Sequence, residues 1–231
     1  MESYDIRTDF LNIGTRKEVK RGEYICNPLI DGITQTVCYL EQGVASLITY
    51  NDAGEERVHL YFNAKRVIGF AGVLVRMFAD DWKKNYDWGY VMAPQMCWAI
   101  AKTDCLFYHI TEQQFLLLMS ESPDFCKGIL NSMTHNYLEL INKFHITMDG
   151  NRTAQFCQWL LSCSIKKGDG YIVPKTFSFA EVSKYLGMHP VTVSRLAKKL
   201  KEMGAIDRKD SCIIIKDKDL LISLMHHQDL M

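Results

Sequence analysis

The residues best suited to chemistry lie between Ser178 and Asp217, where two short helices and a basic hairpin are predicted. Ser178, with Glu181 three residues later, has the spacing of a helix N-cap. Gly187 can adopt the positive φ that a tight corner between two helices requires. His189 then caps or opens the second helix. The pattern predicts a helix-turn-helix.

The two helices each have a buried and an outward side. The apolar residues expected to face the core are Ala180, Val182 and Leu186 in the first helix and Val193, Leu196 and Leu200 in the second. The residues of the second helix expected to point outward and bind DNA are His189, Val191, Thr192, Ser194, Arg195, Lys198 and Lys199. Gly204 is expected to end this helix, and Cys212 to Ile215 to form the strand of a wing.

These outward side chains match the chemistry of DNA reading. A recognition helix presents its N-terminal residues to base edges in the major groove. Arg195 can donate two hydrogen bonds to guanine, and Val191 and the methyl group of Thr192 can pack on thymine methyls. The lysines, including Lys184 and Lys201, can contact phosphates. An ordinary helical hairpin with a solvated basic face has a similar pattern, but the corner glycine and the wing favour DNA binding.

Charge is unevenly distributed along the chain. The 231 residues contain 27 Lys and Arg and 27 Asp and Glu, but residues 151–231 contain 13 basic and 8 acidic residues. A basic C-terminal part joined to an acidic remainder indicates a polyanionic partner for the C-terminal part. The N-terminus lacks the apolar segment of a secretory signal, and no stretch of about 18 apolar residues is present, so we expect a cytoplasmic protein without membrane spans.

Residues 17–110 have the pattern of a β-domain. Strands are predicted at 37–40, 44–50 and 58–62, with turns between them, and strand character resumes after residue 96. This spacing suits a sandwich or roll. Residues 76–96 are polar and aromatic and are interpreted as an excursion between strands.

A change to helical spacing begins at Thr111, which with Gln114 has the pattern of a capping box. A long helix is predicted from Pro123 to Met148, with a near-heptad apolar stripe formed by Cys126, Leu130, Met133, Tyr137, Leu140, Phe144 and Met148. The stripe can pack on its own β-domain or form the seam of a dimer. Asp149-Gly150 is predicted to end this helix, followed by a helix at 151–164, a loop at 166–170 and a short strand at 171–173.

The eight cysteines are scattered, with no C-x2-C pair, and we interpret them as reduced, buried apolar residues. A redox role for one thiol, or a thiolate metal ligand, is the alternative. The chain lacks the nucleophile, phosphate-loop and zinc-protease motifs of common enzymes, so a non-enzymatic function is expected.

The sequence resembles the bacterial Crp–Fnr superfamily over nearly its whole length. Leu186 to Ile206 reads L-G-x-x-x-x-T-V-S-R followed by K-x-L-x-x-x-G-x-I, the helix-turn-helix signature of that family. Asn151 to Leu161 resembles the helix after its hinge, and Gly43-Val44 and Ala101 to Cys105 resemble its β-roll. The resemblance implies an α+β fold with a β-roll effector domain at 1–122, a dimerisation helix at 123–149 and a winged helix-turn-helix at 150–231.

The resemblance also implies partners. We expect a homodimeric transcription regulator on a near-palindromic operator, contacting RNA polymerase if it is an activator. The recognition-helix start H-P-V-T-V-S-R resembles the subgroup that senses halogenated aromatics in organohalide respiration, which favours an A/T-rich half-site. Cyclic-nucleotide-binding members carry Gly-Glu and Arg-Ser pairs where this chain has Gly69-Phe70 and Gln95-Met96, so cyclic AMP is not the expected effector.

An apolar, aromatic effector site is predicted instead. Its expected residues are Phe70, Gln95, Met96, Trp98 and Tyr137, with Trp82, Tyr86 and Trp88 nearby on the excursion, although each aromatic can equally be a core residue. No cofactor or metal is expected. The alternative is a gas or redox sensor on the same scaffold, for which His59, His109 and Cys97 are the haem-ligand candidates.

Overall fold

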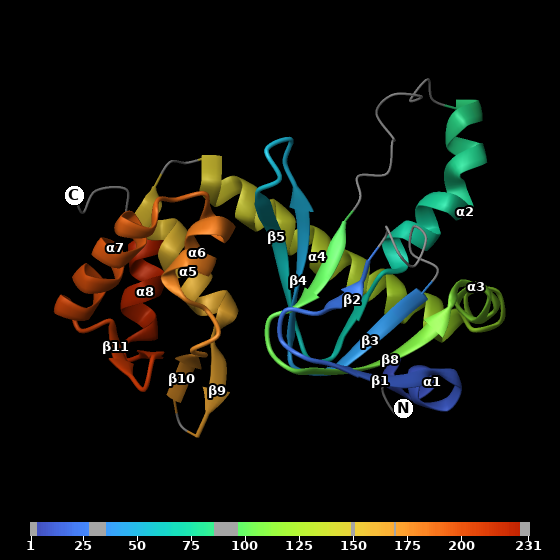
Figure 1. Ribbon diagram of the computed structural model, residues 1–231, viewed down its shortest axis with the longest axis horizontal. Coiled ribbons are helices and arrows are strands. Elements are labelled where there is room, and N and C mark those ends of the chain that lie inside the picture. The colour runs from blue at the N-terminus through green and yellow to red at the C-terminus, as the bar shows by residue number, and fades with distance from the viewer. Residues whose placement is uncertain (1–3, 28–35, 86–96, 149–150, 169, 227–231) are drawn as a thin grey trace. The chain divides into compact units, whose positions relative to one another are not determined.

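A computed structural model describes residues 4–27, 36–85, 97–148, 151–168 and 170–226 (Figure 1). The chain divides into two compact units, Met1–Leu138 and Glu139–Met231. This division falls inside a helix, so the end of that helix belongs to the second unit. The predicted boundary at Asp149-Gly150 lies outside the described residues.

The helices of the described chain are α1 (Arg7–Ile13), α2 (Phe70–Asn85), α3 (Glu112–Glu121), α4 (Pro123–Met148), α5 (Arg152–Cys163), α6 (Phe179–Leu186), α7 (Pro190–Glu202) and α8 (Lys218–His226). The strands are β1 (Thr15–Val19), β2 (Tyr24–Cys26), β3 (Thr36–Gln42), β4 (Val44–Tyr50), β5 (Glu56–Asn63), β6 (Arg66–Ile68), β7 (Trp98–Ala101), β8 (Cys105–Thr111), β9 (Ile165–Lys167), β10 (Gly170–Val173), β11 (Ile206–Lys209) and β12 (Cys212–Ile215). The α+β class predicted from the sequence is confirmed.

Two four-stranded antiparallel sheets form the β-roll of the first unit. Their strand orders are β1-β8-β3-β6 and β2-β7-β4-β5. Alternate residues of both sheets face each other and make one buried cluster, to which Leu40 and Phe107 contribute from one sheet and Ala45 and Phe62 from the other. The three strands predicted at 37–40, 44–50 and 58–62 are confirmed as β3, β4 and β5.

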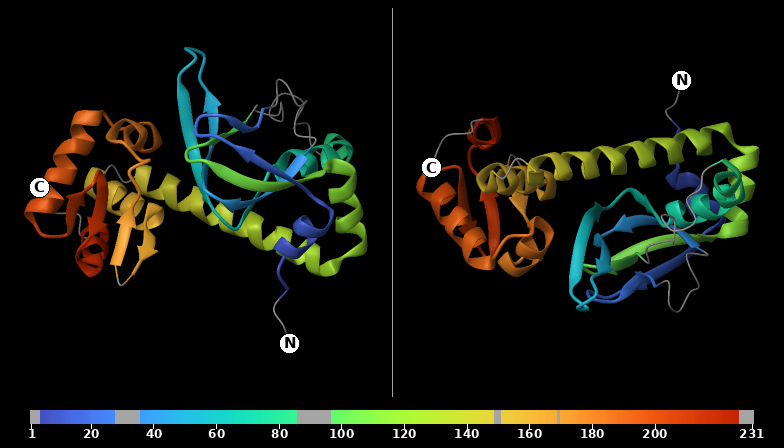
Figure 2. Two further views of the ribbon diagram at one scale, coloured as in Figure 1. Left: turned by 60° about the horizontal axis from the view of Figure 1, so that its bottom comes forward. Right: turned by 90° about the horizontal axis from the view of Figure 1, so that it is seen from above.

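Helices cover the outer face of the sheet that contains β3 and β8. Phe10 of α1, Phe115 of α3 and Phe125 of α4 are fully buried together with Val37 and Ile110 of the sheet. Figure 2 shows α1, α3 and the start of α4 together at one end of the unit. This second cluster anchors the start of α4 on the roll, and the predicted capping box of Thr111 and Gln114 is present at the start of α3.

The predicted excursion at 76–96 needs correction in its first half. Residues up to Asn85 belong to α2, which begins at Phe70. Phe70 and Val73 lie one helical turn apart and are both buried in the helix-covered cluster, whereas Met77 is exposed. The polar and aromatic composition of the segment concealed this spacing. Tyr86, Trp88 and the rest of the excursion lie outside the described residues.

The stripe on α4 is exposed in the single chain. Tyr137 is 61% exposed, Phe144 63% and Met148 70%, and Leu130, Met133 and Leu140 are also exposed. Only Cys126, near the start of the helix, is half-buried. The face that α4 turns to its own chain carries Phe125 and Ile129 first and polar residues afterwards. Leu130, Met133 and Tyr137, which belong to the same unit as the β-domain, therefore do not pack on it.

The second unit is built on α5. Phe156, Trp159 and Leu160 of α5 are buried, and the Trp159 ring stacks on Phe156 and meets Phe177 edge to face. Strands β9, β10, β12 and β11 form one antiparallel sheet. Lys166 and Lys167, predicted as loop, belong to the exposed edge strand β9, because charged residues suit a sheet edge and obscure a strand in the sequence.

The cysteines partly follow the prediction. All eight are free, and five of them, Cys26, Cys38, Cys105, Cys157 and Cys163, are buried. Cys97, Cys126 and Cys212 are half-buried. Across the described residues, no helix combines the length and apolar character needed to span a membrane.

Candidate nucleic-acid interface

Helix α6 begins and ends at the residues that the sequence indicates. The Ser178 side chain accepts a hydrogen bond from the Glu181 amide at 3.3 Å, and Gly187 has φ +64° at the C-cap. A side chain would be strained in that conformation, so the glycine permits the corner that leads into α7. Val182 and Leu186 are buried as predicted, but Ala180 is exposed and Ser183 is buried in its place. The prediction for Ala180 is therefore wrong: the helical period places Val182, Ser183 and Leu186 on the inner side.

Helix α7 starts with a cap made by a histidine. Nδ1 of His189 accepts a hydrogen bond from the Val191 amide at 3.3 Å, and Pro190 takes the first helical position. The buried residues of α7 are Val193, Leu196, Ala197 and Leu200. The buried spacing predicted for this helix is confirmed, with Ala197 as an addition. One side of α7 is thus held in the core, and the other is left to solvent.

The predicted DNA-binding residues share this outer side. His189, Val191, Ser194, Arg195 and Lys198 are exposed, whereas Thr192 and Lys199 are half-buried. Val191 is 51% exposed. An apolar side chain presented beside Ser194 and Arg195 suits a surface that meets both thymine methyls and polar base edges.

Lysines flank this surface and have partners of their own. Lys198 pairs with Glu202 at 3.8 Å and Lys201 with Asp207 at 2.9 Å, and all four side chains are largely exposed. The hydrogen bond from Lys201 holds the pKa of Asp207 below its usual value. Exposed pairs of this kind contribute little to stability, so phosphates can replace the carboxylates as partners of these lysines.

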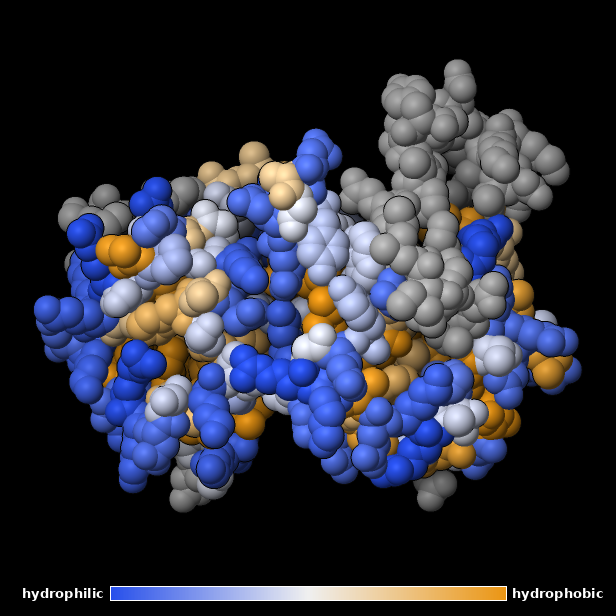
Figure 3. All heavy atoms as spheres, in the orientation of Figure 1, coloured by the Kyte–Doolittle hydropathy of each residue, from blue (hydrophilic) through white to orange (hydrophobic). Residues whose placement is uncertain are grey.

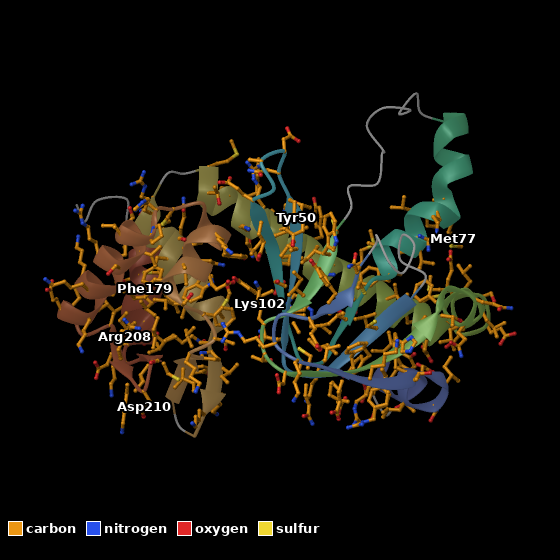
Figure 4. All side chains as sticks on the ribbon, in the orientation of Figure 1. Tyr50, Met77, Lys102, Phe179, Arg208 and Asp210 are labelled. Carbon is orange, nitrogen blue, oxygen red and sulfur yellow. The ribbon has the colours of Figure 1, made fainter. Side chains whose placement is uncertain are left out.

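The wing adds a basic residue that the sequence interpretation missed. Arg208 of β11 is exposed, and its guanidinium carbon lies 4.7 Å from the ring centroid of Phe179 at the start of α6. Figure 4 shows Arg208 next to Phe179, with Asp210 beyond it at the tip of the wing. Asp210 and Ser211 both have positive φ, as a tight two-residue hairpin requires. Hydrophilic side chains cover most of the visible face around the wing (Figure 3).

The predicted effector residues are not brought together by the described chain. Phe70 is buried in the helix-covered cluster on the outer face of the β3-β8 sheet. Trp98 lies on β7 in the other sheet, where its ring meets Tyr50 edge to face at 4.9 Å. Tyr137 is exposed on α4, and Gln95 and Met96 lie outside the described residues.

The histidines proposed as haem ligands also lie apart. Nε2 of His59 on β5 is 2.8 Å from the Thr49 hydroxyl, and His109 lies on β8 in the other sheet. Burial, followed by the charge of Lys17, lowers the pKa of His109, and burial raises the pKa of Cys97. Within the described chain no group of three or more His, Cys, Asp or Glu side chains could hold a metal ion.

Comparison with known proteins agrees with this geometry. Residues 154–224 match the family described as the Crp-like helix-turn-helix domain, a span that contains α6, α7 and the wing. The segment that holds the candidate interface is therefore similar to a Crp-like helix-turn-helix domain. The match covers less than half of the chain, and no curated protein matches the sequence.

Solved structures extend the likeness to the whole fold. FixK2 from Bradyrhizobium japonicum is 14% identical with a TM-score of 0.71, covering 92% of this chain and 97% of that one. The c-di-GMP-responsive global regulator CLP of Xanthomonas campestris is 17% identical with a TM-score of 0.64, over 91% and 97% of the two chains. A variant of CprK complexed with OCPA is 18% identical with a TM-score of 0.57, over 96% and 94%. The chain has the Crp/Fnr fold, as the sequence predicts.

Proposed function

We propose that this protein is a homodimeric, sequence-specific DNA-binding transcription regulator of the Crp/Fnr type, controlled by a small effector. The observation that carries the proposal is the outer side of α7, where Val191, Ser194 and Arg195 are exposed at the start of a helix whose other side is locked in the core. Base-reading helices present their N-terminal residues in this way. The Crp-like match of the same segment supports it.

The DNA contacts divide into two kinds. Arg195, Val191 and Thr192 read base edges, and we expect them to select an A/T-rich half-site with one guanine-containing pair. His189, Ser194, Lys198 and Lys199 complete the surface, and Arg208 is added as a phosphate contact of the wing. Phosphate contacts set affinity and salt dependence and do not select a sequence.

The dimer is supported by the exposed stripe of α4. Leu130, Met133, Tyr137, Phe144 and Met148 form an apolar surface along one helix, and nothing in the described part of the chain covers it. Two such helices packed side by side would bury it, and an isologous pair has a two-fold axis. The operator would then be near-palindromic.

The effector is proposed to be an aromatic compound other than cyclic AMP. Gln95-Met96 stand where cyclic-nucleotide sensors of this type carry Arg-Ser, and an unpaired phosphate would be costly to bury. CprK, one of the similar structures, is complexed with OCPA. The proposed effector residues remain Phe70, Gln95, Met96, Trp98 and Tyr137. Phe70 is buried in the helix-covered cluster, so its effect on the effector would be indirect.

Selection of bound sequences from a random DNA pool tests this function. The full chain is incubated at fixed salt with and without a panel of aromatic compounds. Enrichment of an A/T-rich palindrome only with an aromatic compound supports the whole proposal. A palindrome without any compound keeps the regulator and directs the search to haem or thiol sensing, with His59, His109 and Cys97 as first targets. If no sequence is enriched under any condition, even after haem and iron are restored, regulation through DNA binding is refuted.

A further inference from the structure

Helix α4 and the helix-turn-helix meet within the second unit, although α4 begins in the first. The unit that contains α6 and α7 starts at Glu139, so the end of α4, from Glu139 to Met148, belongs with the DNA-binding domain. On the side of α4 turned to this domain, Glu139 and Lys143 are half-buried one turn apart. The same helix carries the exposed apolar stripe. One helix therefore holds both a proposed dimer seam and an attachment for the DNA-reading element.

A lysine and a tyrosine make this attachment. The Nζ atom of Lys143 lies 3.9 Å from the ring centroid of Tyr185 in the last turn of α6. That distance is well inside the range of a cation–π contact, which is stronger where water is partly excluded. Burial lowers the pKa of Lys143 to about 8, and burial, followed by the neighbouring Cys163 and Glu139, raises the pKa of Tyr185. The ammonium group therefore lies in a partly desolvated site.

Two further observations place this contact close to the corner between α6 and α7 and to the end of α4. Tyr185 lies two residues before Gly187, the corner from which α7 departs. The Gln155 side-chain amide of α5 donates to the backbone carbonyl of Thr147 at 3.5 Å, which ties a second helix of the domain to the same end of α4. Because α6 directly precedes α7 in the chain and is attached to α4, the direction of α7 relative to α4 depends on this contact.

We propose that Lys143 is a positioning residue for DNA binding, which holds α6 on the end of α4 through the ring of Tyr185 and so fixes the placement of α7 relative to the dimer axis. The inference rests on the proposed function. In a dimer joined along α4, this contact sets how far apart the two recognition helices lie. It therefore controls which spacing between half-sites is bound, and it does not change the recognition of bases within each half-site.

The test measures operator affinity of the full-length protein by fluorescence anisotropy. The probes are the selected palindrome, the same palindrome with one base pair inserted or deleted between half-sites, and a single half-site. The variants are Lys143→Met and Tyr185→Leu, which remove the cation and the ring, and Lys143→Arg and Tyr185→Phe, which keep them. Lys218→Met is the matched control, since Lys218 lies 5.2 Å from the Tyr171 ring in the same unit without involving α4.

The expected result separates positioning from folding. Lys143→Met and Tyr185→Leu each lose roughly five- to thirtyfold of the preference for the correct spacing, with half-site affinity within about twofold of wild type. The double variant is no worse than either single variant. Lys143→Arg, Tyr185→Phe and Lys218→Met keep the wild-type preference. If Lys143→Met or Tyr185→Leu does not fold by circular dichroism, Lys143→Gln and Tyr185→Met replace them under the same criteria.

Two outcomes count against the inference in different ways. Folded Lys143→Met and Tyr185→Leu proteins with an unchanged spacing preference overturn the role of Lys143 and leave the regulator standing. A wild-type protein that binds no selected sequence refutes the proposed function itself, and the positioning role with it.

Discussion

In the proposed regulator, Arg195 is the residue on which recognition of the DNA sequence should depend most. It lies on the exposed side of α7, between Ser194 and the buried Leu196, so its backbone is fixed by the core while its guanidinium is free to reach a base. We predict that Arg195→Ala weakens binding to the selected operator by about 1–3 kcal/mol and relaxes selectivity at one base pair in each half-site. Anisotropy titrations on operators with single base changes measure both effects.

Lys198→Ala provides the comparison for Arg195. Removing a phosphate contact at Lys198 should weaken binding to all sequences alike and make binding less dependent on salt. If Arg195→Ala instead lowers affinity equally for every operator variant, Arg195 is a phosphate contact and the base reading is done by other side chains.

Arg208 acts, in our proposal, as a charge held in place by Phe179. Replacing Arg208 with Met should reduce the slope of log affinity against log salt by about 1 per subunit, because one phosphate contact is removed. Phe179→Leu keeps the charge but removes the ring, so affinity should fall by about 0.5–2 kcal/mol with a smaller change in slope. Titrations from low to moderate salt measure the slope. Lys127→Met, an equal charge change on the exposed side of α4, should leave it unaltered; the same slope in wild type and Arg208→Met contradicts the contact.

The residues of this interface differ in how far the sequence alone reveals them. The His189 cap and the buried set of α7 follow from local spacing, which is the same in any context. The pairing of Arg208 with Phe179 joins two elements far apart in the chain, so only the folded domain brings it about. The effector residues are the hardest to predict from the sequence. Phe70, for example, is an apolar aromatic residue that suits a ligand pocket and a packed core equally well, and the fold buries it in the core.

At the scale of the element, the exposed apolar stripe of α4 is the proposed dimer contact. We predict that Tyr137→Glu, in the middle of the exposed stripe, weakens the dimer roughly 100-fold or more, because a carboxylate would be buried opposite its own copy. Analytical ultracentrifugation over a range of concentrations measures this. Asn131→Glu, an exposed position away from the stripe, is the matched control. A Tyr137→Glu protein with the wild-type association constant would place the dimer contact elsewhere.

Elements with a strong period were predictable and those shaped by their surroundings were not. The long helix ends at Met148 as its spacing indicates, and β3, β4 and β5 lie where apolar runs predict them. Helix α2 was hidden because its polar, aromatic half dominates the composition, although Phe70 and Val73 set its buried side. Strand β9 owes its conformation to pairing with β10, which no local signal in Ile165–Lys167 announces.

The half-buried Lys143 on α4 predicts a pH dependence of stability. Its pKa of about 8 lies below the ordinary 10.5, so between these values the unfolded chain binds more protons and the free energy of unfolding rises with pH. Below about pH 8 both states are protonated, and the full cost of burying the charge is present. Above pH 8, the free energy of unfolding of the wild type should therefore rise relative to that of Lys143→Met by up to ~1.4 kcal/mol per pH unit. The rise should be smaller because Lys143 is partly exposed to solvent.

Chemical denaturation of both proteins between pH 7 and 9.5 measures this difference. Burial raises the pKa of Cys157 to about 12 and also raises that of Cys163, which opposes the trend above pH 9 but cancels in the comparison. Lys143→Met should be at least as stable as wild type at pH 7 while losing spacing preference on DNA. A pH-independent difference would mean that Lys143 keeps its usual pKa.

At the scale of the molecule, the proposed function assigns separate tasks to the basic and acidic parts of the chain. The excess of 13 basic over 8 acidic residues in 151–231 belongs to the part that we propose to bind DNA, and the acidic remainder contains the roll. A neutral protein with one basic module would bind DNA in a defined orientation, because phosphates repel the acidic remainder. The proposed regulation then requires that an effector bound in the roll favours one placement of the DNA-binding units.

Such regulation obeys a reciprocity that can be measured. An effector that raises operator affinity by a given factor must itself bind the operator-bound protein more tightly by the same factor, typically 5- to 150-fold or about 1–3 kcal/mol. Calorimetric titration of the selected effector into free and operator-bound protein should return the factor found in DNA titrations. Lys143→Met should reduce both factors together, because the contact that holds α6 on the end of α4 is removed. A tightly bound compound with equal affinity for the two forms shifts no equilibrium, and is then a ligand of the roll without a regulatory effect.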